Sequence, residues 1–338
     1  MNVVSLFNGM NTGRQALENV GIKVNKYYSS EIKPYAIELT QHHFPDTIQV
    51  GDVTKWREWN IDWSTIDLIL SGSPCQDLSA AGKRAGINGS KSSLFFTFVE
   101  ILEYIKTLNP KVLFLQENVG SASKLDVGIM SRALGVYPVR INSSLVTAQL
   151  RDRYYWSNIR TKETMFDVVT DIPQPKDRKI LLKDILESGF TEKEKSMCLL
   201  ESNSRPLLTP FRMAKRYFEI GMSNLIFKDD KTYLRVKEAT KIGFVDVANN
   251  KAVDLSYLDS KTRRGRLMKN KSNCLLRNNE YFVFKDNDLR YFTQNELEIL
   301  QGFKNGYTSI LTRNQAACLL GDGWTLPIIE HIFKFIKE

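Results

Sequence analysis

Short apolar runs alternate with longer segments of helical periodicity over the first 160 residues. The strand-like segments lie at 3–7, 26–30, 47–50, 66–70 and 112–116, and the last two are apolar runs. Helices are predicted between them, at 13–20, 34–43 and 93–108. Strands that alternate with helices over short connections indicate a parallel sheet covered on both faces. We therefore predict an α/β fold built on a doubly wound, Rossmann-like sheet.

The pattern changes after residue 159. A linker-like stretch, Ile-Pro-Gln-Pro-Lys-Asp at 172–177, precedes a predicted helix at 180–188. Residues from about 190 to 285 are irregular and basic, and they contain short β-type runs. This change in pattern indicates a second, smaller domain.

Helical patterns return near the C-terminus. Thr-Gln-Asn-Glu at 293–296 has the spacing of a capping box, and two further helices are predicted at 314–320 and 327–337. The predicted organisation is a first domain over 1–188, a smaller irregular β-rich domain over 189–289, and a closing segment, 290–338, that completes the first domain.

The composition is that of a soluble globular protein, since 42% of the 338 residues are hydrophobic and 25% are charged. No apolar run approaches the roughly 20 residues of a membrane helix, and the N-terminus resembles a strand more than a signal peptide. The four cysteines are dispersed and there are three histidines, so neither a disulfide framework nor a metal site is predicted. We expect a cytoplasmic monomer that binds no metal and no membrane.

The net charge of +9 is unevenly distributed. Residues 160–271 contain 24 of the 47 Lys and Arg but only 16 of the 38 Asp and Glu. A charge excess confined to one part of a chain favours a polyanionic partner such as nucleic acid. The alternative is a solvated basic surface.

The first predicted turn, Phe-Asn-Gly-Met-Asn-Thr-Gly at 7–13, joins a strand to a helix. Glycines let a ligand approach the backbone there, and the helix N-terminus supplies free N–H groups. Glu31 lies 22 positions after Gly9, and Asp52 follows the third strand. The set suggests a nucleoside cofactor, and the missing G-x-G-x-x-G spacing argues against NAD. Plain loop carboxylates are the alternative for both acids.

Cys75 stands at the carboxyl end of the fourth predicted strand, after a Ser-Gly-Ser-Pro turn. Active sites of open α/β sheets lie at that end of the strands. A thiol there can be a nucleophile if its pKa is lowered or its target is activated. The simpler interpretation is a packed, small apolar side chain.

Several segments resemble, in order, the motifs of the C5-cytosine-specific DNA methyltransferase family. They are FNGMNTG at 7–13, SPCQ at 73–76, QENV at 116–119, QLRDR at 149–153, RYFT with LQGF within 290–303, and LGDGWTLP at 320–327. One such motif would be unspecific, but this many in order over nearly the whole chain are specific. The closing motif departs from the family's usual Gly-Asn-Ser, because Asp322 and Gly323 stand there.

The resemblance implies transfer of a methyl group from S-adenosylmethionine to C5 of cytosine. The Cys75 thiolate would attack C6, and Glu117 would activate the ring at N3. Arg151 and Arg153 would hold a base oxygen and order the carboxylate. The cofactor would be bound by Phe7, Gly9, Asn11, Thr12, Gly13, Glu31, Ile32, Asp52, Val53, Pro74, Gly323 and Trp324.

A cytosine stacked in a duplex must flip out before it can react. Residues 76–93 contain three glycines and several basic residues, and we predict a loop that closes over the flipped base. The basic second domain is expected to be a target-recognition domain. The predicted DNA contacts are Gln76, Ser79, Lys83, Arg84, Arg263, Arg264 and Arg266.

The expected substrate is double-stranded DNA, and the expected setting is DNA methylation, as in restriction–modification, at the nucleoid if the chain is prokaryotic or phage-encoded. An RNA (tRNA) cytosine-C5 methyltransferase of the same fold and a catalytically silent DNA-binding relative stay open as alternatives. The basic second domain favours DNA, and the intact Cys75, Glu117 and Arg151 favour activity.

Overall fold

The computed structural model describes residues 1–74, 94–189, 191, 193–200, 225–227, 233–248, 251–254, 261–262, 266–268, 281–284 and 289–337. The chain forms two compact units. Unit 1 comprises Met1–Ile180, Cys198–Ser204 and Leu297–Glu338, and unit 2 comprises Leu181–Met197 and Arg205–Glu296. The domain boundaries at 188/189 and 289/290 stay a prediction.

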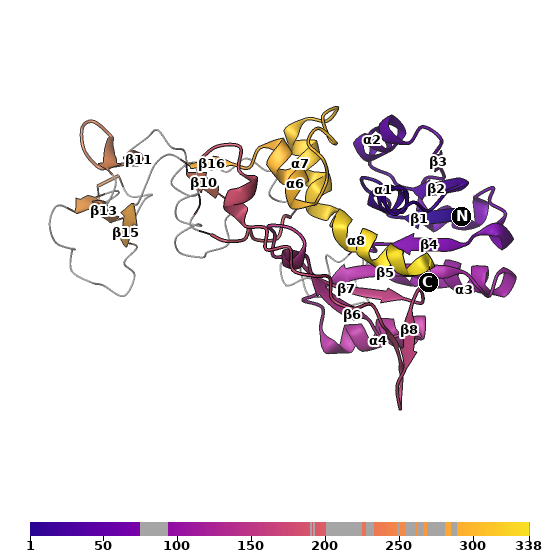
Figure 1. The fold of residues 1–338 in the computed structure, drawn as a ribbon. Coiled ribbons are helices and arrows are strands. Elements are labelled where there is room, and N and C mark those ends of the chain that lie inside the picture. Colours follow the sequence, from indigo (N-terminus) through magenta and orange to yellow (C-terminus); the bar gives the residue numbers. More distant parts are fainter. Residues whose placement is uncertain are drawn as a thin grey trace. The chain divides into compact units, whose positions relative to one another are not determined.

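A seven-stranded sheet with the order β3-β2-β1-β4-β5-β7-β6 forms the centre of the described part of unit 1 (Figure 1). Its strands are β1 (Asn2–Leu6), β2 (Lys26–Ser30), β3 (Ile48–Gln49), β4 (Leu68–Ser71), β5 (Leu113–Val119), β6 (Val139–Asn142) and β7 (Asp152–Ser157). Strands β1 to β5 pair in parallel, whereas β7 runs antiparallel to β5 and β6. The predicted α/β, Rossmann-like sheet is confirmed.

Alternate strand residues point to opposite sides of this sheet, and helices pack against both sides. The helices are α1 (Thr12–Asn19), α2 (Pro34–His43), α3 (Leu94–Leu108), α4 (Lys124–Leu134), α6 (Gln294–Leu300), α7 (Arg313–Asp322) and α8 (Leu326–Phe333). On one face, Val4 and Ile69 pack in the cluster that contains Phe98 of α3 and Met130 of α4. On the other face, α1 packs with α8, and Gly13 of α1 lies against Leu70.

Local signals in the sequence explain where several helices begin and end. Pro34 occupies the start of α2, where its missing N–H costs no hydrogen bond. The Ser123 hydroxyl accepts a hydrogen bond from the N–H of Asp126 at 3.1 Å and caps α4, and Gly135 ends that helix with a φ of 71°. The helix predicted at 180–188 is wrong, because only one 3-10 turn, Leu182–Ile185, forms there.

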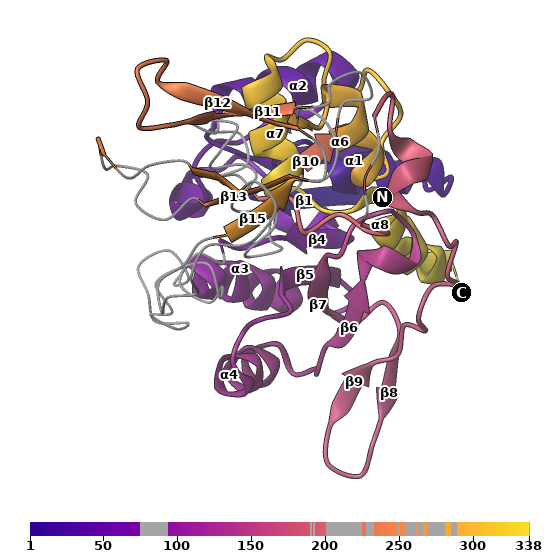
Figure 2. The ribbon, with the colours of Figure 1, turned by 90° about the vertical axis from the view of Figure 1, so that its left-hand side faces the viewer.

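A β-hairpin of β8 (Thr161–Glu163) and β9 (Val168–Thr170) follows β7 and projects from unit 1 (Figure 2). Because β7 is antiparallel to β5, with Ser157 opposite Leu115, the chain leaves β7 at the amino-terminal edge of the parallel strands. The hairpin therefore emerges at the edge opposite to the one where β1 and β4 end.

The described part of unit 2 contains small antiparallel sheets, as its short β-type runs predicted. β10 (Leu225–Phe227) pairs with β16 (Leu289–Tyr291), and β11 (Tyr233–Lys237) pairs with β12 (Phe244–Ala248). β13 (Lys251–Asp254) lies between β14 (Arg266–Met268) and β15 (Tyr281–Phe284). Across both units, no helix in the described ranges is long and apolar enough to span a membrane.

Candidate active site

The carboxyl ends of the parallel strands bring most of the predicted site residues to one edge of the sheet. Phe7 follows β1, Glu31 follows β2, Pro74 closely follows β4, and Glu117 lies near the end of β5. The strand order reverses at β1, since β2 and β3 lie on one side of it and β4 and β5 on the other. Ligands of open α/β sheets bind outside such a switch point.

The first turn has an unusual backbone. Phe7, Gly9 and Asn11 have positive φ angles of 55°, 56° and 64°, of which only the one at glycine is free of strain. Asn11 precedes α1 and is fully buried, yet neither polar atom of its side-chain amide has a hydrogen-bond partner in the described ranges. Such an amide is costly to bury, so the turn suits a ligand that carries polar groups.

Glu31 ties this turn to the end of β2. Its Oε2 accepts a hydrogen bond from the N–H of Gly9 at 2.8 Å, and its Oε1 accepts from the N–H groups of Ile32 at 2.7 Å and Lys33 at 2.9 Å. A carboxylate oxygen has two acceptor sites, so one site of Oε2 remains for a ligand hydroxyl. The Ile32 side chain, predicted to contact the cofactor, is 71% exposed beside it.

Asp52 and Val53 lie at the start of a 3-10 helix, Val53–Glu58. The Asp52 carboxylate accepts a hydrogen bond from the N–H of Thr54 at 2.9 Å, and this bond lowers the pKa of Asp52. Asp52 is exposed, whereas Val53 is buried. The pair therefore offers an ionised acceptor beside an apolar side chain at the edge of the sheet.

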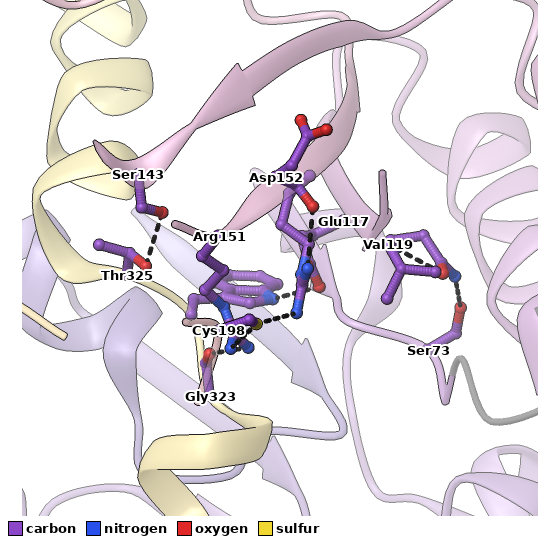
Figure 3. Close-up of polar contacts among 12 residues, drawn as sticks. Ser73, Glu117, Val119, Ser143, Arg151, Asp152, Cys198, Gly323 and Thr325 are labelled. Carbon is purple, nitrogen blue, oxygen red and sulfur yellow. Dashed lines mark hydrogen bonds and ion pairs between the residues drawn. The ribbon is translucent and has the colours of Figure 1, made fainter. Parts of the chain in front are cut away.

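Ser73 anchors the chain just before the predicted nucleophile. Its buried hydroxyl accepts a hydrogen bond from Nε2 of Gln116 at 3.0 Å. It also accepts one from Nδ2 of Asn118 at 3.5 Å (Figure 3), and the two bonds fix the end of β4 to β5. Pro74 is the last described residue of this stretch. The remaining site residues predicted here, Cys75, Gln76, Ser79, Lys83 and Arg84, lie outside the described residues.

Glu117 is a buried carboxylate with a separate donor on each oxygen. Nε of Arg153 lies 2.7 Å from Oε1 in an ion pair, and Nε1 of Trp324 donates a hydrogen bond to Oε2 at 3.1 Å. The side chains of Glu117 and Arg153 are only 11% and 12% exposed, so this ion pair is little screened by water. The structure thus brings together three of the residues predicted for the site.

Arg151 contacts main-chain carbonyls instead of Glu117 (Figure 3). Its guanidinium donates to the oxygens of Leu199 at 3.0 Å, Gly321 at 3.1 and 3.2 Å, and Gly323 at 2.8 Å. Burial lowers the pKa of Arg151, and the neighbouring Arg153 adds to this effect. Arg151 therefore holds the closing segment in place, and its predicted contact with the base stays a prediction.

Three side chains that were not among the predicted site residues also shape this region. Lys33 forms an ion pair with Asp322 at 2.7 Å, and Gln149 donates to the carbonyl of Leu300 at 3.1 Å. The thiol of Cys198 accepts hydrogen bonds from both arginines of the 149–153 motif, at 3.3 and 3.7 Å. Two of the three left a signal in the sequence, since Asp322 is a departure from the family motif and Gln149 begins the motif at 149–153.

Of the predicted DNA contacts in unit 2, only one lies among the described residues. Arg266 begins β14, while Arg263 and Arg264 lie outside the described residues. Within the described ranges, no group of three or more His, Cys, Asp or Glu side chains could hold a metal ion.

Comparison with known families supports the sequence resemblance. The sequence model of the family described as C-5 cytosine-specific DNA methylase matches residues 1–338. The chain is 32% identical over 201 residues to the orphan methyltransferase M.SPRI of Bacillus phage SPR, and 37% identical over 120 residues to the type II methyltransferase M.NlaIV of Neisseria lactamica. These alignments cover 56% and 34% of this chain but only 43% and 27% of the two relatives.

Longer and more distant similarities cover almost the whole chain. The type II methyltransferase M1.ScrFI of Lactococcus lactis is 26% identical over 99% of this chain and 78% of its own length. Among solved structures, DNMT2 of Spodoptera frugiperda matches with a TM-score of 0.57 at 17% identity, over 100% of both chains. The methyltransferase EhMeth of Entamoeba histolytica matches with the same TM-score at 20% identity, over 99% of this chain and 97% of its own. At these identities the structures support the fold alone.

Proposed function

The chain belongs to the C-5 cytosine-specific DNA methylase family, and from this membership we propose that it methylates C5 of cytosine in double-stranded DNA. The observation that carries the proposal is the buried Glu117 of β5, which is held by Arg153 of β7. This carboxylate lies on the strand next to β4, which leads through Ser73 and Pro74 to Cys75. A carboxyl group and a thiol at neighbouring strand ends are the two groups that the chemistry requires.

S-adenosylmethionine fits the groups at the first turn. The buried amide of Asn11 lacks partners in the described ranges, Gly9 leaves room beside the backbone, and one acceptor site of Glu31 remains for a ribose hydroxyl. We assign its binding to these residues together with Phe7, Thr12, Gly13, Ile32, Asp52, Val53, Pro74 and Gly323, while the cofactor contact predicted for Trp324 stays a prediction. When bound, this cofactor supplies an electrophilic methyl group.

The protein's own groups would prepare the cytosine ring. The thiolate of Cys75 adds to C6, which makes C5 nucleophilic, and Glu117 shares a proton with N3 so that the ring can accept this addition. Arg153 keeps the Glu117 carboxylate oriented through the 2.7 Å ion pair. After transfer, a base such as water would take the C5 proton as the Cys75 thiolate leaves C6, and the N3 proton would return to Glu117, which restores the ring.

The basic part of the chain would bind the DNA. We propose that residues 189–289 form the target-recognition domain and that Arg263, Arg264 and Arg266 contact the duplex there. Gln76, Ser79, Lys83 and Arg84 would contact the strand around the flipped cytosine. Phosphate contacts by Lys and Arg provide most of the affinity in such interfaces, while base contacts provide sequence specificity. We expect the protein to act as a monomer.

Transfer of labelled methyl groups tests this function. The protein is incubated with labelled S-adenosylmethionine and unmethylated duplex DNA, with tRNA in a parallel reaction. We expect label in DNA as 5-methylcytosine and none in tRNA. Label in tRNA alone would replace the proposal with RNA methylation, and no label in either would support a silent relative.

A further inference from the structure

Trp324 contacts the carboxylate proposed to activate the base, although the two residues are 207 positions apart in sequence. Its indole N–H donates to Oε2 of Glu117 at 3.1 Å, while Arg153 holds Oε1 at 2.7 Å. Neither donor can accept a proton from the carboxyl group. A carboxylate oxygen has two acceptor sites, so each oxygen of Glu117 keeps one of them for the base. The two donors together fix the plane of the carboxylate.

The indole is seated against Gly72, just before Ser73 and Pro74. A Cβ atom at Gly72 would lie 2.7 Å from Nε1 of Trp324, which is closer than real Cβ contacts allow, and 3.2 Å from Cε2, which is tighter than most such contacts. The absence of a side chain at position 72 thus lets the indole approach the end of β4. Trp324 therefore touches both strand ends of the proposed active site.

The backbone around Trp324 is held on both sides. Arg151 binds the carbonyls of Gly321 and Gly323, at 3.1 and 2.8 Å for Nη2. Thr325 donates to Oε1 of Gln301 at 2.9 Å and accepts from the hydroxyl of Ser143 at 2.9 Å. These bonds limit how far the indole can move, which a positioning role requires.

We propose that Trp324 is a positioning residue for Glu117, acting through its indole N–H on Oε2. This inference rests on the proposed function. It differs from the cofactor contact predicted for Trp324, because a positioning residue changes the rate of transfer and a cofactor contact changes the affinity for S-adenosylmethionine. It also differs from simple packing, which a phenyl ring would largely preserve.

Trp324→Phe separates these roles, since it keeps an aromatic ring and removes the N–H. With S-adenosylmethionine and DNA both saturating, we expect the single-turnover rate of methyl transfer to fall about tenfold, a fraction of the 10²–10⁴ that a general acid contributes. The Kd for S-adenosylmethionine, measured by calorimetry without DNA, should change less than about twofold. Gly72→Ala, which displaces the indole, should lower the same rate.

Trp59→Phe is the matched control, because the buried Nε1 of Trp59 has no hydrogen-bond partner in the described ranges and its ring stacks on Trp63. It should keep the wild-type rate. If the wild-type protein transfers methyl groups and Trp324→Phe transfers them at the same rate, the positioning role is refuted. A higher Kd with an unchanged rate would refute it in favour of a cofactor contact, whereas an inactive wild-type protein refutes the proposed function itself.

Discussion

Two arginines of one motif, two positions apart, have different partners. Arg151 is 3% exposed and binds carbonyls of Leu199, Gly321 and Gly323, whereas Arg153 pairs with Glu117. Their spacing on an extended segment predicts only that they share a side. The carbonyls that bind Arg151 lie up to 172 positions away, so no local pattern could identify them. A buried guanidinium with this many carbonyl partners stabilises the fold.

Conservative substitutions should separate the two arginines. Arg151→Lys cannot reach all three carbonyls, and we expect the free energy of unfolding to fall by about 2 kcal/mol, since an unsatisfied buried acceptor costs about 1–3 kcal/mol. Arg153→Lys loses the fixed guanidinium geometry on Glu117, so methyl transfer should slow by about 10- to 100-fold with a smaller loss of stability. Urea unfolding and single-turnover transfer measure the two effects. The reverse pattern would contradict these assignments.

The Lys33–Asp322 ion pair explains the unusual acid in the closing motif. It joins Lys33, whose N–H binds the Glu31 carboxylate, to the closing segment. The side chains of Lys33 and Asp322 are 35% and 48% exposed. Exposed pairs contribute about 0.2–1 kcal/mol, so Lys33→Asp or Asp322→Lys should raise the Kd for S-adenosylmethionine by at most about fivefold. The double charge swap should restore affinity, and 1 M salt should shrink the difference. Additive losses in the double variant would exclude a direct coupling.

The same pair has a defined pH dependence. Burial alone would lower the pKa of Lys33, but the hydrogen bond and charge of Asp322 outweigh burial and raise it. A raised folded pKa means that the contribution is complete below the unfolded value of about 10.4 and is lost as the pH rises through the folded value. The difference in the free energy of unfolding between wild type and Asp322→Asn should therefore stay constant from about pH 7 to 9. A decline within this window would show that another group titrates.

At the scale of elements, the buried parallel strands were the most predictable part. Continuous apolar runs marked β1, β4 and β5 because central parallel strands are buried on both faces. The helix predicted at 180–188 failed because tertiary contacts compete with local propensity. The N–H of Leu182 bonds to the carbonyl of Glu194, whereas the local bond from the N–H of Leu181 to the Asp184 carboxylate caps only the single 3-10 turn.

The capping box predicted at the start of α6 is confirmed. The Thr293 hydroxyl accepts from the N–H of Glu296 at 3.2 Å, and the Glu296 carboxylate accepts from the N–H of Thr293 at 2.9 Å. Thr293→Ala should lower the free energy of unfolding by about 1 kcal/mol, as for other N-cap losses. Asn314→Ala, at an exposed position in the first turn of α7, is the control and should change little. Equal unfolding midpoints for the two variants would contradict a capping role.

At the scale of the whole molecule, the basic excess and the proposed active site fall largely in different parts of the chain. Unit 1 carries the sheet and the proposed site, while the basic excess of residues 160–271 falls largely in the sequence of unit 2. The sequence could indicate a polyanion partner from this asymmetry, but not the residues that read a base. Base contacts depend on side-chain placement in a groove, and neither charge nor spacing encodes that placement.

Covalent trapping tests the central claim most directly, because a fluorine at C5 blocks the elimination that releases Cys75. The protein is incubated with S-adenosylmethionine and duplex DNA containing 5-fluorocytosine, and the adduct is mapped by mass spectrometry. We predict a denaturation-stable complex linked through Cys75, and none with Cys75→Ala. An adduct at another residue, or the same adduct formed by Cys75→Ala, would contradict the account.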